Sequence, residues 1–208
     1  MHSLVAMDCR SVDRAGPSAG TKYLGWRGQN GVRFYAEVLY EGAPWYPRSA
    51  TADKVRMGKW PDGSSAPDGQ YTNYWMRKFS DVNNGEMQYT GEFYKCPPWV
   101  RLRYAEILLD YAEACIELGK DDEAKTYINI VRARAGMPPV TETGDALKTR
   151  YRNERRIEFA FEEQRFFDVR RWLIGPESAI SGNGVDIEYP VQGSFDNPTF
   201  TKVMVDAG

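Results

Sequence analysis

The fold is decided by residues 101–172, which begin RLRYAEILLDYAEACIELGKDDEAKTYINIVRARAGMPPV (101–140) and, four residues later, continue DALKTRYRNERRIEFAFEEQRFFDVRRW (145–172). Glycine and proline, which interrupt helices, occur here only where one helix would stop and the next begin. The stretch predicts a helix over about 101–118, a tight turn and a second helix over about 121–135. A proline-marked loop and a third, highly charged helix follow.

The first predicted helix carries two apolar rows against one polar row, so it should be buried over more than half of its circumference. Because the turn after it is short, we expect the first two helices to pack as an antiparallel hairpin. Asp121 or Asp122 is expected to cap the second helix. The side chains expected to be buried are Leu108, Leu109, Ala112, Cys115, Ile128 and Val131.

The third predicted helix is rich in both signs of charge. From Asp145 to Trp172 there are six acidic and eight basic residues, so the segment carries a net charge of +2. Pairs such as Glu162 with Arg165 can form at helical spacing. We therefore expect the arginines to be structural, and Trp172 to belong to the core. If most of them instead lie unpaired in one cleft, an anionic ligand explains them better. The expected arginines and their acidic partners are Arg155, Arg156, Arg165, Arg170 and Arg171, with Glu154, Glu158, Glu162, Glu163 and Asp168.

The rest of the chain has a different composition. Residues 1–100 contain 11 of the 19 glycines and five of the six tryptophans, and they show no long helical period. Short strand-like runs occur at 32–40 and 91–96, among aromatic loops. The sequence SGNG at 181–184 indicates a turn. We therefore expect a loop-rich aromatic region over 1–100, a helical region over 101–174 and an irregular segment over 175–208.

Composition excludes several functions. A net charge of −2 gives no support to a nucleic-acid partner. The only histidine is His2, so no Ser-His or Cys-His pair and no His-rich metal site can form inside the fold. Phosphate-binding glycine motifs are missing as well. Carboxylates are plentiful enough for glycoside hydrolysis, but no pair stands out. We expect no catalytic residue, no metal site and no cofactor.

Binding remains, and the residues by themselves offer a helical scaffold with an aromatic, loop-rich face. Sugar rings present C–H faces that flat aromatic side chains receive well, and loops on a rigid scaffold are where such rings are displayed. Trp45 and Trp60 are favoured because proline and glycine flank them. Burial of these rings against the helices is the simpler alternative for each of them. The candidate ligand-binding residues are Trp26, Trp45, Tyr46, Trp60, Tyr71, Tyr74 and Trp75.

Three phrases of the helical region, RYAEILLDYAEACIELG, INIVRARAGMP and ERRIEFAFEEQRFFDVRRW, resemble the C-terminal signature of the SusD/RagB family. MRKF at 76–79 and DCR at 8–10 also fit the family pattern. One departure is Glu163, where the family usually has glycine. The resemblance implies a mostly α-helical, SusD-like C-terminal lobe, with a helix hairpin, a charged third helix and a loop-rich region with a few short strands.

The same resemblance implies a function and a cellular location. Members of this family are outer-membrane, nutrient-binding lipoproteins of Bacteroidetes-type bacteria. We therefore expect non-catalytic binding of oligosaccharide or polysaccharide on the extracellular face, for uptake through a SusC-like TonB-dependent transporter. MHSLVAMDCR lacks a signal-peptide pattern and a lipoprotein site at Cys9, so the chain resembles an internal-to-C-terminal piece. The alternatives are a tetratricopeptide-like protein-interaction module and a glycoside hydrolase.

Overall fold

The computed structural model describes residues 33–34, 36–43, 54–67, 69, 73–79, 99–175 and 182–205. The chain divides into two compact units. The helical unit comprises Asn30–Phe34 and Pro98–Gly175, and the strand unit comprises Met1–Gln29, Tyr35–Pro97 and Pro176–Gly208. The division into 1–100, 101–174 and 175–208 stays a prediction.

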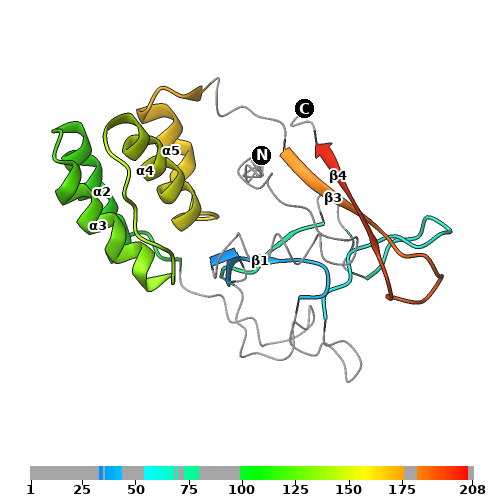
Figure 1. Cartoon of the computed structure of the whole chain (residues 1–208). Coiled ribbons are helices and arrows are strands. Elements are labelled where there is room, and N and C mark those ends of the chain that lie inside the picture. Colours follow the sequence, from blue (N-terminus) through cyan, green and yellow to red (C-terminus); the bar gives the residue numbers. More distant parts are fainter. Residues whose placement is uncertain are drawn as a thin grey trace. The chain divides into compact units, whose positions relative to one another are not determined.

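The helical unit contains the predicted hairpin. Helix α2 spans Tyr104–Glu117 and α3 spans Asp121–Arg134, and the two lie side by side (Figure 1). The expected core residues are all buried, and Leu109, Ala112 and Ile128 are completely inaccessible to solvent. Cys115 is buried as a small apolar group, as predicted, and Trp172 packs against the same core. The periodicity of the sequence therefore predicted this packing correctly.

Glycine ends both helices of the hairpin in the left-handed conformation. Gly119 has φ 69°, and the backbone N–H of Lys120 donates to the carbonyl of Cys115 over 2.8 Å. Gly136 has φ 64° and ends α3 in the same way. This is the hydrogen-bond pattern that glycine permits at a helix C-terminus.

The predicted acidic cap of α3 is wrong. Lys120 occupies the N-cap position, and no side chain caps the helix there. The Asp121 carboxylate instead accepts a hydrogen bond from the backbone N–H of Gly144 over 2.7 Å. Gly144 is the first residue of helix α4, so Asp121 satisfies an N–H at the start of the next helix.

The charged third helix is two helices. Helix α4 spans Gly144–Glu158 and α5 spans Gln164–Arg171. Phe161 and Glu163 between them have φ values of 66° and 63°, in the left-handed region that no α-helix continues through. The charge pattern runs unbroken across this turn, and the glycine that would mark it is replaced by Glu163. A single helix was therefore the wrong expectation.

The strand unit contains two short antiparallel pairs. Strand β1 (Val38–Leu39) pairs with β2 (Trp75–Met76), and β3 (Gly182–Glu188) pairs with β4 (Thr199–Val205). In the second pair Gly182 lies opposite Val205, and Glu188 lies opposite Thr199. The run predicted at 32–40 is extended only at β1, and the run at 91–96 lies outside the described residues.

The pair β3–β4 corrects the expectation of an irregular segment over 175–208. Val185, Ile187 and Tyr189 are buried and alternate with polar residues, which is the period of a half-buried strand. The last three residues of SGNG, Gly182–Gly184, lie in β3, so the predicted turn is not found there. None of the helices in the described part of the chain is long and apolar enough to cross a membrane.

Candidate functional site

Trp60, one of the two favoured candidates, opens a tight turn in the strand unit. The backbone N–H of Gly63 donates to the Trp60 carbonyl over 2.9 Å, and the N–H of Trp60 donates to the Ser64 carbonyl over 2.9 Å. Gly63 has φ 82°, a conformation that suits glycine, and Pro61 has the fixed φ that the turn needs. The exposed tip is Pro61–Ser64, and Trp60 lies at its base, partly exposed.

The ring of Trp60 belongs to an aromatic cluster, which we define as Trp60, Tyr189 and Phe195. The ring centroid of Trp60 lies 6.3 Å from that of Tyr189 and 5.8 Å from that of Phe195. The centroids of Tyr189 and Phe195 are 5.3 Å apart, with their planes at 79°. The indole Nε1 is buried and has no hydrogen-bond partner among the described residues. Two further rings thus back the indole and fix its orientation.

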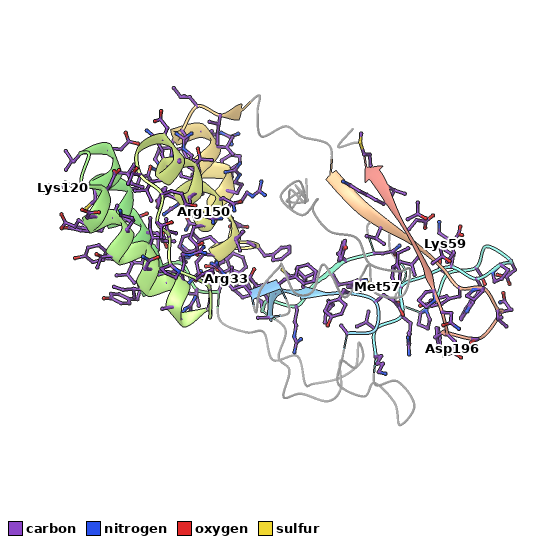
Figure 2. The ribbon with its side chains drawn as sticks, in the orientation of Figure 1. Arg33, Met57, Lys59, Lys120, Arg150 and Asp196 are labelled. Carbon is purple, nitrogen blue, oxygen red and sulfur yellow. The ribbon has the colours of Figure 1, made fainter. Side chains whose placement is uncertain are left out.

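Close backbone packing holds this cluster to strand β3. The N–H of Lys59 donates to the Ile187 carbonyl, and the N–H of Tyr189 donates to the Lys59 carbonyl, each over 2.8 Å. A Cβ on Gly58 would come within 2.6 Å of the Tyr189 ring, so only glycine fits there. Figure 2 shows Lys59 beside the β3–β4 pair and Asp196 in the turn that joins the two strands.

Charged side chains lie next to the aromatic cluster. Arg56 lies 4.8 Å from the centroid of Phe195 and pairs with Glu41 over 3.1 Å. The other oxygen of Glu41 accepts the backbone N–H of Met57 over 2.7 Å. Burial, together with the Glu41 carboxylate, raises the pKa of Tyr189, so its hydroxyl stays protonated. At the tip, Asp62 accepts hydrogen bonds from Ser64 and remains exposed, within reach of solvent hydroxyls.

The structure places the other predicted residues as follows. Tyr74 is partly exposed, and Trp75 in β2 is 37% exposed. Asn73, which precedes Tyr74, is buried and donates to the Val185 carbonyl over 2.7 Å, so it is structural. The remaining four candidates, Trp26, Trp45, Tyr46 and Tyr71, lie outside the described residues.

The sequence did not indicate Tyr189 and Phe195 as partners of Trp60. Both lie about 130 positions along the chain from Trp60, in the segment that was expected to be irregular. The available signal was the alternation that ends at Tyr189, which predicts a strand and therefore a partner surface. Phe195 lies in the turn after that strand, where no pattern marks it.

The helical unit contains a network of ion pairs between acidic and arginine side chains. Glu154 binds Arg33 and Arg132, and Glu158 binds Arg33, Arg103 and Arg134. Arg103 also pairs with Glu162 over 2.7 Å. Figure 2 shows Arg33 beside the helices. The two glutamates are buried, and they tie together segments that are distant in the sequence.

A second part of the network links α2, α4 and α5. Arg155 donates to both oxygens of Asp168 over 2.9 Å and also pairs with Asp110 over 2.5 Å. Arg171 pairs with Asp168 and with Glu113. Burial would raise the pKa of Glu113, but hydrogen bonds from Arg171, Trp172 and Tyr151 hold it below its usual value.

The prediction of structural arginines is therefore confirmed for Arg155 and Arg171. Of the ion pairs that Arg155 and Arg171 form, only the pair of Arg171 with Asp168 has the spacing of neighbours on one helix. Their other partners lie further away in the sequence. Arg170 lies over the ring of Phe166 at 3.4 Å and donates to its carbonyl. Arg156 and Arg165 form no ion pair in the described part of the chain, so the expected pairing is not found for these two, although Arg165 lies over the Trp172 ring.

These features can be compared with known proteins. The sequence matches the SusD family over residues 13–206. The chain therefore belongs to the SusD family. SusD-like protein P2 of Formosa agariphila is 37% identical over 98 residues, which cover 42% of this chain and 19% of that protein.

Solved structures agree with this assignment. A SusD-like protein from Bacteroides fragilis is 38% identical with a TM-score of 0.68, and the match covers 84% of this chain and 32% of that one. A SusD-like carbohydrate-binding protein from the same species is 29% identical with a TM-score of 0.51, over 79% of this chain and 32% of that one. The chain thus spans about a third of the length of these structures. The predicted fold class, a mostly helical SusD-like lobe with a few short strands, is confirmed.

Proposed function

We propose that this chain is part of a non-catalytic protein that binds oligosaccharide or polysaccharide at the outer face of the outer membrane. The bound glycan would pass to a SusC-like TonB-dependent transporter. The observation that carries the proposal is membership in the SusD family, together with the likeness to a Bacteroides fragilis protein described as carbohydrate-binding. The anchored state and the transporter partner come from the family resemblance.

Within the described residues, Trp60 is the ring best supported as a ligand contact. It is partly exposed, Tyr189 and Phe195 back it, and a hydrogen-bonded turn fixes its position. A flat ring that is already immobile loses little entropy when a sugar stacks on it. Asp62, two residues further on, is exposed and could accept sugar hydroxyls. Trp26, Trp45, Tyr46, Tyr71, Tyr74 and Trp75 are proposed as further contacts.

The test is isothermal titration calorimetry with a panel of neutral and acidic oligosaccharides. Once a binder is found, Trp60→Ala should weaken it by an amount equivalent to about 0.5–1.5 kcal/mol beyond the lost contact area. Tyr104→Ala is the matched control, since Tyr104 is an exposed ring on helix α2. No oligosaccharide should be cleaved, so reducing ends should not appear. Equal binding by wild type and Trp60→Ala would remove Trp60 from the site.

A second candidate function is binding of a protein, and one observation favours it. Helix α2 carries exposed Tyr104, Ile107 and Tyr111, and its C-cap residue Leu118 is exposed as well. Apolar side chains at this helical spacing are typical of a docking face. A chain that binds no oligosaccharide, but whose retention on an immobilised transporter depends on Tyr104 and Ile107, would favour this function.

A further inference from the structure

Three arginines of the helical unit form no ion pair with any acid that the structure describes. Arg152 and Arg156 lie one turn apart on α4, and Arg165 follows at the start of α5. None of the three forms an ion pair in the described part of the chain. The Nε of Arg152 is buried and has no hydrogen-bond partner there. A buried guanidinium N–H without an acceptor is costly, so the arrangement calls for an explanation.

Two acids of this region, Asp168 and Glu113, are already engaged. Asp168 accepts three hydrogen bonds, two from Arg155 and one from Arg171. Glu113 is bound by Arg171, by the indole N–H of Trp172 and by the Tyr151 hydroxyl. The positive charge on this side of α4 and α5 is therefore in excess.

Two of the three guanidinium groups share an aromatic neighbour, and the third residue, Arg156, lies one turn from Arg152 on α4. Arg152 and Arg165 approach the same Trp172 ring, with guanidinium carbons 5.1 Å and 6.0 Å from its centroid. Burial lowers the pKa of Arg165, and the positive charges of Arg156 and Arg152 lower it further, while the nearby Asp168 carboxylate opposes them only in part. Each side chain is still partly exposed, so a ligand can reach it. Three positive charges beside one carboxylate that is already bound by Arg155 and Arg171 destabilise the fold, which is typical of a functional site.

We propose that Arg152, Arg156 and Arg165 form an anion site that binds a carboxylate or sulfate group of an acidic oligosaccharide. The planar fork of a guanidinium matches the oxygens of these groups and binds them with charge-assisted hydrogen bonds. Carboxylate and sulfate are the groups through which a sugar polymer carries negative charge. The proposal rests on the proposed glycan-binding function and adds the chemical class of the glycan.

The experiment titrates the whole 208-residue chain with three probes: an oligogalacturonate, a sulfated galacto-oligosaccharide and a neutral galacto-oligosaccharide of the same length. The variant is Arg152→Gln/Arg165→Gln. The matched control, Lys148→Gln/Arg150→Gln, removes two positive charges from the same helix, and both of its residues already pair with acids, Glu117 and Glu142. Figure 2 shows Arg150 among these helices.

We expect at least one acidic probe to bind wild type, and the variant to weaken it at least about tenfold, because two charge-assisted contacts are lost. The control should stay within about twofold, and rising NaCl should weaken acidic binding to wild type. The variant breaks no ion pair among the described residues and relieves repulsion, and it removes only the contacts of Arg152 and Arg165 with the Trp172 ring, so its melting temperature should change little. A folded variant that binds the acidic probe as wild type does would overturn the proposal.

Other outcomes separate this inference from the proposed function. Binding of the neutral probe without either acidic one would overturn the anion site and leave glycan binding in place. Failure of all three probes, and of the wider panel, would overturn both. Arginine-dependent binding of inorganic sulfate without binding of an acidic oligosaccharide would refute the glycan as the source of the anion.

Discussion

Glu154 offers the sharpest test of how the helical unit is held together. Its carboxylate binds Arg33 over 2.6 Å through one oxygen and Arg132 of α3 through the other. The side chains of Glu154, Arg33 and Arg132 are only 2%, 8% and 4% exposed. Glu154→Gln keeps the shape of the side chain but removes its charge. The buried guanidinium groups of Arg33 and Arg132 would then face the neutral amide of Gln at position 154 in place of a carboxylate.

The expected loss follows from the cost of an unpaired buried charge. Removing one partner of a buried ion pair typically destabilises a protein by about 3–5 kcal/mol. We expect the lower end, about 3 kcal/mol, because the amide keeps one acceptor oxygen. Arg33 also retains Glu158 at 3.2 Å, and Arg132 retains the Pro138 carbonyl at 2.7 Å. Since domains are stable by only about 5–15 kcal/mol, this loss should be obvious.

The assay is urea unfolding followed by circular dichroism at 222 nm, which reports on the helices. Glu142→Gln is the matched control: its pair with Arg150 is solvent-exposed, so it should cost no more than about 1 kcal/mol. Replacing Glu154 and Arg132 together with apolar residues of similar volume should recover part of the loss. If Glu154→Gln proves no more costly than Glu142→Gln, the buried network does not stabilise the unit.

Two further predictions concern single positions in the helical unit, and the same unfolding assay measures both. Leu109 is fully buried in the hairpin core, so Leu109→Ala should cost about 2–5 kcal/mol; a cost near zero would contradict the packing of α2 on α3. Glu163 has φ 63°, so Glu163→Gly should gain up to about 1 kcal/mol by relieving left-handed strain. A less stable glycine variant would show that the Glu163 side chain makes a contribution larger than this strain.

The parts of the fold that depend on local pattern could be predicted from the sequence. The apolar rows at helical spacing predicted α2 and α3, and Gly119 and Gly136 marked their ends. The break between α4 and α5 was missed because Glu163 adopts the left-handed conformation without being glycine. Its conformation is imposed by packing of the whole unit, which overrides the local preference of the residue.

The long-range contacts could not be predicted, because no local rule joins the residues involved. Arg33 reaches Glu154 across 121 positions of the chain, and the N–H of Gly58 reaches the Tyr189 hydroxyl across 131. Helical spacing suggested that the acids of α4 would pair with arginines of the same segment. In the structure Glu154 and Glu158 pair with arginines from other segments, since tertiary packing brings those groups to buried positions.

Residues 145–172, which carry a net charge of +2, therefore contain two kinds of arginine. Arg155 is buried against Asp168 and Asp110, whereas its neighbour Arg156 and nearby Arg165 lack an acidic partner in the described part of the chain. Removing a charge should consequently have opposite effects at different positions of this segment. Glu154→Gln should destabilise the helical unit, whereas neutralising Arg165 should leave it at least as stable as wild type. If both changes destabilise it equally, the excess charge is part of the structural network, and the case for an anion site loses its physical basis.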